Sequence, residues 1–421
     1  QLGKEGHDIT IVDKNRERIS QVSNIYDVMG IAGNGASYKI LQEAGIDDAD
    51  LIIAVTGSDE LNLLCCTIAT QVGNCAAIAR VRTPEYSQEA KYLRDKLGLA
   101  LIINPELEAA IEMAHILHLP SSLEVTNFAH GQAQLIKYEI PEGSILDGTK
   151  LMDLGTRHHA NILIGAVERD DEVTIPSGDF VLRKGDKLSF VGERRHTKEF
   201  FSHIGVNTHS VKNTLIIGGG KAAYYLAKQL ISRGIKVKII ENSFERCEEL
   251  SILLPDAVII NGDGTEQALL KEEGIETCQS FVPLTGIDEE NIMLTLYAKQ
   301  VSNAKVITKL NRITFTNVIN SLDLGSVISP KYITSEAIIA YVRAKKNSMN
   351  CNIETLYHMY DSRVEAIEFF VSENSNVTDI PLRDLKLKKH LLICFINRNG
   401  KIIIPTGNDS IQKNDTVMII T

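Results

Sequence analysis

A glycine-rich turn is the part of this sequence that could do the clearest chemistry. The apolar run Leu215–Ile217 precedes it, an apolar-periodic stretch follows it, and the turn itself reads Gly218, Gly219, Gly220, Lys221, Ala222, Ala223. Such a turn joins a strand to a helix: its first glycine allows a tight turn, the next lets a pyrophosphate approach the backbone, and a small third residue allows close helix–strand packing. The free N–H groups of the helix N-terminus would then attract a phosphate.

An acidic residue stands where this type of turn requires one. Glu241 ends the next predicted strand, 21 residues after Gly220. A carboxylate at that place accepts hydrogen bonds from the ribose hydroxyls of adenosine, and it disfavours a 2′-phosphate. The pattern therefore predicts NAD(H) in preference to NADP(H). A glycine turn with an incidental surface glutamate is the structural alternative.

The sequence contains a long internal repeat. Residues 6–13 resemble residues 234–241, at an offset of 228 positions. One residue is inserted afterwards in the second copy, and the offset is then 229. At that offset, residues 33–63 match residues 262–292 at 11 of 31 positions. A later stretch, Ile175–Asp179, resembles Ile404–Asn408 at the same offset. The chain is therefore two copies of a unit of 229 residues, too long for a solenoid repeat.

Each copy divides into two parts of different pattern. The first part alternates short apolar strands with helices, which indicates a parallel sheet covered on both faces. In the first copy we expect strands at 9–12, 28–32, 51–55 and 77–81, with helices beginning at Arg16, Ser37 and Asp59. The second part, about residues 123–190, reads as a small α+β unit with strands at 134–140, 161–168, 173–175 and 187–191.

The predicted fold is therefore α/β, with two tandem Rossmann-like parallel-sheet domains, each followed by a small α+β lobe. We place these four parts at residues 1–120, 121–207, 208–347 and 348–421. The joints are expected near Pro120, at 208–213 and at 345–350.

The repeat predicts a related site in the first copy. Asp13 corresponds to Glu241, but no glycine loop stands before it. Because Gln1 aligns with Gln229 in the helix after the loop, we expect the first strand and its loop to precede residue 1. Thr421 also falls in a predicted strand, so we expect the last lobe to continue beyond it.

Further repeated residues follow the predicted strands, at the edge where open α/β sheets bind ligands. One set comprises Gly33-Asn34-Gly35 and Gly262-Asp263-Gly264, in which Asn34 or Asp263 would reach an adenine edge. A second set comprises Thr56-Gly57-Ser58-Asp59 and Thr285-Gly286-Ile287-Asp288. Here we favour ligand proximity for the threonines, whereas helix N-caps and ligand contacts are equally good interpretations of the aspartates.

Cations occupy corresponding places after the next strand in each copy. These are Arg80 and Lys309, and a cation there would meet a pyrophosphate or a terminal phosphate. A plain surface charge is the alternative. Lys309 replaces the arginine of the first copy, and Pro283 is expected to interrupt the strand before Thr285. We therefore expect the second site to differ from the first in ligand or affinity.

Composition excludes several classes of protein. The 44 Lys and Arg against 54 Asp and Glu give a net charge of −10, which is unsuited to wrapping nucleic acid or adhering to anionic lipid. Hydrophobic residues make up 44%, as in globular proteins, and we find no apolar run long enough to span a bilayer and no signal peptide. The 7 cysteines lack a Cys-x-x-Cys spacing and are expected to be reduced, cytoplasmic thiols.

Other chemistry finds no support in the sequence. His115 and His118 share a helix face but lack a third ligand, and His158-His159 reads as a loop, so no metal site is predicted. The chain has no nucleophile elbow and no Walker A lysine loop.

With these residues together, the sequence resembles the peripheral, nucleotide-binding subunit of the Trk potassium uptake system, the TrkA family, which has tandem RCK domains. The stretches that carry the resemblance are 8–13, 44–50, 54–62, 79–86 and the two Ile-Pro-Ser/Thr-Gly segments. The resemblance covers essentially all 421 residues.

The resemblance implies a function. It implies NAD(H), with ATP and ADP as further ligands, bound without catalysis at the following residues: Asp13, Thr56, Gly57 and Arg80 in the first lobe, and Gly218–Ala222, Glu241, Thr285, Gly286 and Lys309 in the second. It also implies a cytoplasmic protein, peripheral on the inner face of the cell membrane, that forms a dimeric or tetrameric ring of RCK domains. The ring would gate a separate potassium-translocating membrane subunit, and Pro105–His118 would be a helix that crosses to a partner lobe.

Two rival functions stay open. One is an NAD-dependent oxidoreductase with a duplicated cofactor domain, which would need an acid or base in a substrate pocket outside the Rossmann units. The other is a nucleotide sensor for a different transporter.

Overall fold

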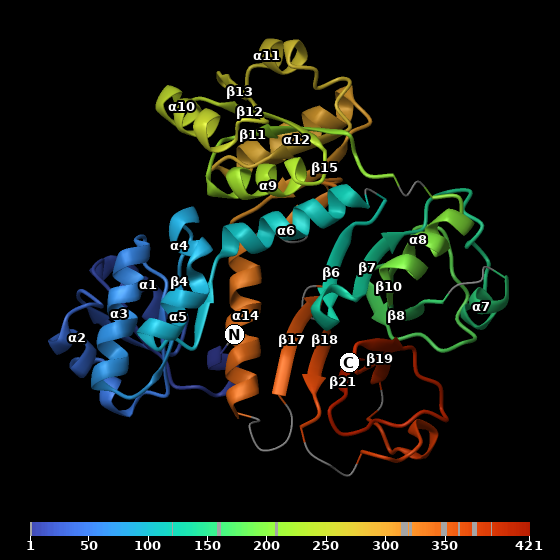
Figure 1. Ribbon diagram of the computed structural model, residues 1–421, viewed down its shortest axis with the longest axis horizontal. Helices are drawn as coiled ribbons and strands as arrows, with labels where there is room; N and C mark the ends of the chain where they lie inside the picture. The colour runs from blue at the N-terminus through green and yellow to red at the C-terminus, as the bar shows by residue number, and fades with distance from the viewer. Residues whose placement is uncertain are drawn as a thin grey trace. The chain divides into compact units, whose positions relative to one another are not determined.

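The computed structural model describes residues 2–119, 121–157, 161–206, 209–312, 319, 322–346, 352–360, 363–372, 377–388 and 390–421. It forms two compact units, residues 1–107 and 108–421, and each is described by itself. Figure 1 shows the chain coloured from blue at the N-terminus to red at the C-terminus. In the described part of the chain, no helix has the length and apolar character needed to cross a membrane.

The first unit is a Rossmann-like domain, called here N-lobe 1. Its parallel strands form one pair, β1 (Thr10–Asp13) with β2 (Met29–Ala32), and one three-stranded sheet of β3 (Leu51–Ala54), β4 (Ala76–Arg80) and β5 (Leu101–Ile103). The helices are α1 (Arg16–Ile25), α2 (Tyr38–Glu43), α3 (Asp59–Val72), α4 (Pro84–Gln88) and α5 (Ala90–Leu97), with 3-10 segments at Leu2–Glu5 and Ile46–Asp48. Ala54, Cys66, Ala77 and Ala79 belong to the core between α3 and the sheet.

The second Rossmann-like domain, N-lobe 2, has one continuous sheet in the order β13-β12-β11-β14-β15-β16. Its strands are β11 (Asn213–Ile217), β12 (Lys236–Glu241), β13 (Val258–Asn261), β14 (Ser280–Pro283), β15 (Lys305–Lys309) and β16 (Ser326–Ile328). Its helices are α9 (Lys221–Ile231), α10 (Phe244–Leu253), α11 (Gln267–Glu272), α12 (Asp288–Val301) and α14 (Pro330–Lys346). β11 lies between β12 and β14, and the described part of N-lobe 1 has no counterpart of it, which is why that sheet is in two pieces.

Each N-lobe is followed by a small antiparallel lobe. C-lobe 1 begins after α6 (Pro105–His118) and has the sheet order β6-β7-β10-β8-β9, with strands at Glu124–Phe128, Ala133–Glu139, Lys187–Glu193, Leu163–Arg169 and Glu172–Thr174 respectively. It also contains α7 (Leu154–Arg157), α8 (Arg194–His203) and 3-10 segments at Ala129–Gly131 and Leu151–Asp153. C-lobe 2 has the order β17-β18-β21-β19-β20, with strands at Asn352–Met359, Val364–Phe370, Thr416–Ile420, Leu392–Arg398 and Lys401–Ile403, and a 3-10 segment at Leu382–Asp384.

The two C-lobes keep the repeat in their polar contacts as well as in their strands. Arg169 donates to Asp186 at 2.7 Å, and Arg398, 229 positions later, donates to Asp415 at 2.9 and 2.7 Å. Both aspartates are only 1% exposed. A planar guanidinium can hold a carboxylate with two parallel bonds, so each lobe is closed by the same buried ion pair.

The C-lobes share one apolar core, to which Phe128, Leu135 and Val191 contribute from C-lobe 1 and Phe395 and Met418 from C-lobe 2. Polar contacts fix the register across it. The Glu368 carboxylate accepts from the Ala129 N–H at 2.7 Å, and Tyr360 Oη lies 2.7 Å from Ser189 Oγ. The two C-lobes are therefore joined by a shared apolar core and by specific polar contacts.

The alternation of strands and helices predicted for N-lobe 1 is confirmed, and so are the antiparallel strands of C-lobe 1. Strand β6 and helix α8 were not predicted. Pro283 is the last residue of β14, and pairing of β14 with β15 stops at Phe281. The proline therefore ends the strand early, and it does not break it in the middle. Pro120, His158-His159, Thr208 and residues 347–350, where joints or loops were expected, lie outside the described residues.

Candidate nucleotide-binding sites

The glycine loop of N-lobe 2 joins β11 to α9 as the sequence predicted. Gly218 has φ +92°, and a Cβ there would lie 3.2 Å from Leu284 O, so the fold itself requires glycine. Gly219 is crowded too, because a Cβ would meet Leu250 at 2.6 Å. Gly220 differs from both: its φ is −65°, and a Cβ would find no atom within 4 Å. Nothing within the described chain explains a glycine at this position, whereas the approach of a ligand would explain it.

The helix after the loop is left open for an anion. Gly220 is the N-cap of α9, and no side chain caps the helix. The first N–H groups of an α-helix have no partner inside the helix, and the dipole places partial positive charge there. Ala222 and Ala223 are buried, with Ala223 at 0% exposure, so they allow the close helix–strand packing that was predicted. Lys221 begins α9.

Glu241 lies beside the loop, as its spacing predicted. Its carboxylate accepts from the Gly219 N–H at 2.6 Å and from the Ser243 N–H at 2.8 Å. Arg246, from α10, donates to Gly219 O at 2.7 Å. The carboxylate at the end of β12 is therefore held against the glycine loop and is partly exposed at the edge where a ribose would lie.

The loop after β14 forms the other side of this edge. Thr285 donates its N–H to Asn291 Oδ1 at 3.0 Å, and the Asn291 amide donates to Lys309 O at 3.0 Å. Lys309 in turn donates to Leu284 O at 3.4 Å. Gly286 faces open space, since a Cβ would find nothing within 4 Å. The structure thus brings Gly218–Gly220, Glu241, Thr285, Gly286 and Lys309 to one edge of the sheet.

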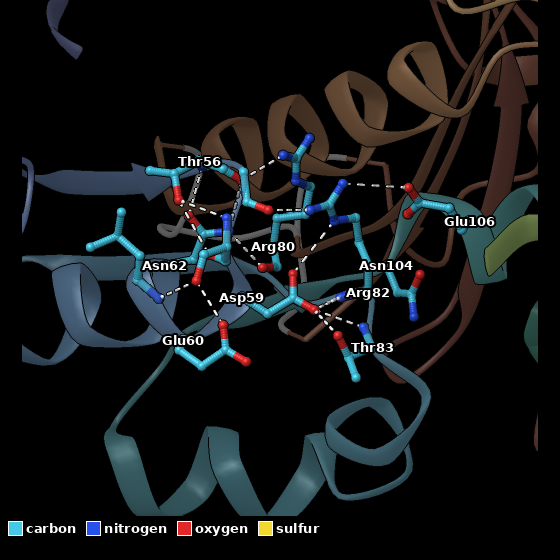
Figure 2. A network of polar contacts seen from close by, with 12 residues as sticks. Thr56, Asp59, Glu60, Asn62, Arg80, Arg82, Thr83, Asn104 and Glu106 are labelled. Carbon is cyan, nitrogen blue, oxygen red and sulfur yellow. Dashed lines mark hydrogen bonds and ion pairs between the residues drawn. The ribbon is translucent and has the colours of Figure 1, made fainter. Parts of the chain in front are cut away.

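N-lobe 1 repeats the arrangement, as Figure 2 shows. Asn62 accepts from the Thr56 N–H at 2.7 Å and donates to Arg80 O at 2.8 Å. Arg80 donates to Thr56 O at 2.7 Å, and its Nε is buried without a partner among the described residues. Burial lowers the pKa of the Arg80 guanidinium. Gly57 also faces open space. Arg80 is therefore a partly buried cation with a spare donor, not a plain surface charge.

Asp13 takes the place of Glu241 at the end of β1. It accepts from the Asn15 N–H at 2.8 Å and pairs with Arg18 at 3.1 Å. The Asn15 N–H bond is the main cause that lowers the pKa of this carboxyl. An ionised carboxylate is what a ribose-binding position needs, although the glycine loop that would face it has no counterpart in the described residues of this lobe.

One interpretation from the sequence needs correction. Asp59 and Asp288 are not N-caps: Ser58 and Ile287 hold those positions, and the buried aspartates accept from the loops after β4 and β15. At the glycines 33, 262 and 264, a Cβ would strike Ile40, Leu269 and Ile217 respectively, within 2.6 Å. Packing within the lobe explains them.

The residues between those glycines make local turns. Asn34 accepts from the Ala36 N–H at 3.2 Å, and Asp263 accepts from the Thr265 N–H and hydroxyl at 2.8 and 2.7 Å. These bonds lower the pKa of Asp263. Contact of either residue with an adenine stays a prediction.

The sequence alone did not indicate the part played by Asn62 and Asn291. Each is 0% exposed and bridges the ends of two neighbouring strands. Their recurrence at the offset of 229 was the available signal. Nor did the sequence indicate the part played by Arg82, which donates to Gly57 O at 2.7 Å and reaches Asp59. In the described ranges, no group of three His, Cys, Asp or Glu side chains could hold a metal ion.

Comparison with known proteins agrees with this geometry. The TrkA-N domain matches residues 1–105 and 214–330, and the TrkA-C domain matches residues 135–205 and 366–421. Trk system potassium uptake protein TrkA homolog 1 of Methanosarcina mazei is 33% identical over 423 residues, covering 99% of this chain and 92% of that protein. The chain belongs to the TrkA family. A second TrkA homolog, from Archaeoglobus fulgidus, is 32% identical and covers 98% of this chain and 92% of its own length.

Solved structures show the same fold in RCK domains. The GsuK channel bound to NAD superposes with a TM-score of 0.65 at 18% identity, over 100% of this chain and 73% of that one. The GsuK RCK domain gives a TM-score of 0.66 at 17% identity, over 100% and 88%. Membership of the TrkA family places the chain among ligand-binding regulators and not among enzymes.

Proposed function

We propose that this TrkA-family chain is the cytoplasmic regulatory subunit of a Trk-type potassium uptake membrane protein, and that it binds NAD(H) without consuming it. The main support is Gly220, whose place in open space at an uncapped helix N-terminus has no explanation within the described chain. A dinucleotide pyrophosphate would fill that space, and Glu241 would accept from the adenosine ribose.

The two N-lobes offer different surroundings to a nucleotide. N-lobe 2 presents Lys309 with Thr285 and Gly286, whereas N-lobe 1 presents Arg80 with Thr56 and Gly57. An arginine can hold a phosphate with two bonds, but a lysine acts as a point charge. ATP and ADP are therefore further ligands, and the two lobes would differ in their preference for them.

Regulation requires the nucleotide to favour one state of the assembly over another. A ligand shifts an equilibrium only by the difference between its affinities for the two states. We propose that a dimer or tetramer of this chain forms a ring of RCK domains on the inner face of the cell membrane. Nucleotide binding at the strand edges would change the angle between lobes, and the ring would pass that change to the potassium-translocating subunit.

Titration calorimetry with NADH, followed by chromatography of the nucleotide, tests the binding claim. We expect saturable binding and recovery of unchanged NADH, with NADPH binding at least about tenfold more weakly because Glu241 disfavours a 2′-phosphate. Steady oxidation of NADH with a metabolite would instead support the oxidoreductase. Co-purification with a transporter of another class would support a sensor for that transporter.

A further inference from the structure

A small pocket between α6 and α8 gathers positive charge outside the nucleotide edges. Both helices are labelled in Figure 1, and the pocket belongs to the unit of residues 108–421. Space of about 300 Å³, including the open mouth, is enclosed by His115, His118, Leu119, Val125, Gln134, Arg194, Thr197 and Lys198. Within its walls the pocket has room for about one water molecule.

The charges at this pocket are of one sign. Arg194 and Lys198 are exposed on the first turns of α8, and neither forms an ion pair within the described residues. Arg233, from the end of α9, is close enough to perturb both histidines and donates to Ala114 O in α6 at 3.0 Å. Burial, followed by Arg233 and Arg194, lowers the pKa of His115 to about 4. Among the described residues, the charged groups that most lower the pKa of His118 are Lys198, Arg194 and Arg233, which are all cations.

A buried hydroxyl points to a missing partner. Thr197 lines the pocket, is only 1% exposed, and its Oγ1 has no hydrogen-bond partner among the described residues. Burying a polar group without a partner is costly, so such atoms usually indicate a ligand or an ordered water. Thr197 is also in the first turn of α8, whose N-cap makes no side-chain bond and whose first turn contains no acidic residue.

The opposite wall is held in place by polar contacts. Gln134, which is 6% exposed, donates to Asn127 Oδ1 at 3.2 Å, and the Asn127 amide lies 3.1 Å from a ring nitrogen of His115. Hydrogen bonds among its own residues therefore hold this wall in place. The Arg194 and Lys198 cations and the Thr197 hydroxyl could still donate hydrogen bonds to an anion.

We propose that this pocket binds a phosphate group, free or as the terminal phosphate of a small metabolite. One phosphate oxygen would enter the pocket that Thr197 lines, and the others would lie outside it, beside the exposed Arg194 and Lys198. Because the lining residues come from α6 and C-lobe 1, an anion would connect α6 to C-lobe 1. This site does not depend on the nucleotide function proposed above.

Equilibrium dialysis of the 421-residue chain with radiolabelled inorganic phosphate, and separately with glycerol 3-phosphate, tests the proposal. Excess NADH is present in both arms to occupy the glycine loop. We expect one phosphate per chain in at least one arm. Arg194→Gln and Thr197→Val should each weaken it about tenfold or more, the loss that one charge-assisted bond represents.

Arg195→Gln is the matched control, because Arg195 is the next residue of α8 but bonds to Glu199 and is 83% exposed. It should leave binding unchanged. Thr197→Val keeps the side-chain shape and removes an unpartnered hydroxyl, so its melting temperature without phosphate should not fall. Binding in the inorganic arm identifies free phosphate, and binding only in the other arm identifies a phosphate monoester. The proposal is overturned if neither binds, or if binding survives Arg194→Gln.

Discussion

At the scale of single residues, the three glycines of one loop have three different physical reasons. Position 218 requires glycine because its φ is positive, and position 219 requires glycine because a Cβ would collide with neighbouring atoms. Neither reason applies at position 220. A sequence motif cannot separate these reasons, because it records only the residue type. The distinction matters for function, since only the glycine that the fold does not need can be assigned to a ligand.

This difference makes a first prediction. Gly220→Ala should change the free energy of unfolding by less than about 1 kcal/mol, because only a cap preference is lost, yet weaken NADH binding about tenfold or more. Gly218→Ala should lower stability by at least about 1–2 kcal/mol, because its φ of +92° strains any residue with a Cβ. Denaturant unfolding and calorimetry measure both. Full NADH affinity in Gly220→Ala would remove the main support for the nucleotide site.

A second prediction separates the ribose contact from the phosphate contact. Glu241→Ala should weaken adenosine binding at N-lobe 2 by about 1.5–3 kcal/mol, the range for a charge-assisted hydrogen bond. Lys309→Ala should leave adenosine binding unchanged, because adenosine has no phosphate. Glu245→Ala removes an exposed carboxylate from the same region and is the control. Adenosine affinity that is indifferent to Glu241→Ala would show that the carboxylate does not contact the ribose.

At the scale of elements, the parallel sheets could be predicted from the sequence, whereas the contacts between strands and between lobes could not. Short apolar strands alternate with helices in both N-lobes, and local periodicity is enough to predict that pattern. The bridge from Asn62 to Thr56 and Arg80 joins residues up to 18 positions apart, and it exists only once two strands lie side by side. The shared core of the C-lobes joins residues more than 200 positions apart and was not predicted.

Helix α14 meets C-lobe 2 at a buried charged cluster that should make stability depend on pH. His358 lies between Glu336 at 3.3 Å and Glu365 at 3.2 Å, and Arg343 pairs with Glu365 at 3.0 Å. Glu336 and then Glu365 raise the pKa of His358 from 6.5 to about 9. A histidine whose pKa is higher in the folded state than in the unfolded state stabilises the protein when it is protonated. This stabilisation is complete below the pKa of the unfolded state, and it is lost as the pH rises through the pKa of the folded state.

The third prediction follows from the upward direction of the His358 pKa shift. The melting temperature of the unmodified chain relative to that of His358→Gln should fall as the pH rises from 6.5 to above 9. Above that range the difference should stay constant, because His358 is then neutral in both states. Differential scanning calorimetry of both chains across this range measures it. A difference that grows with pH would contradict a protonated His358 in the folded state.

At the scale of the whole molecule, duplication yields two related strand edges, and the described residues at the two edges differ. N-lobe 2 has the loop from β11 to α9, whereas the described part of N-lobe 1 keeps Asp13, Thr56, Gly57 and Arg80 without such a loop. The pyrophosphate cradle and the helix dipole are features of that loop. Without the loop, the remaining residues would line only part of the proposed nucleotide site.

The fourth prediction concerns stoichiometry. The 421-residue chain, with its mass verified, should bind NADH at one high-affinity site, because among the described residues only N-lobe 2 has a glycine loop whose backbone N–H groups could hold the pyrophosphate. Gly220→Ala should abolish that site and reveal at most weak binding at N-lobe 1. Calorimetry measures the number of sites per chain. Two sites of nearly equal affinity would show that the pyrophosphate is not held by the glycine loop.

Potassium flux through a Trk-type membrane subunit in proteoliposomes tests the central claim most directly. The chain is added to the side that exposes the cytoplasmic face of the membrane subunit, with and without NADH, and Glu241→Ala is compared with Glu245→Ala. We predict that the chain alters the flux, that NADH changes its effect several-fold, and that only Glu241→Ala removes the response to NADH. A flux that is the same with and without the chain would contradict a regulatory subunit of potassium uptake.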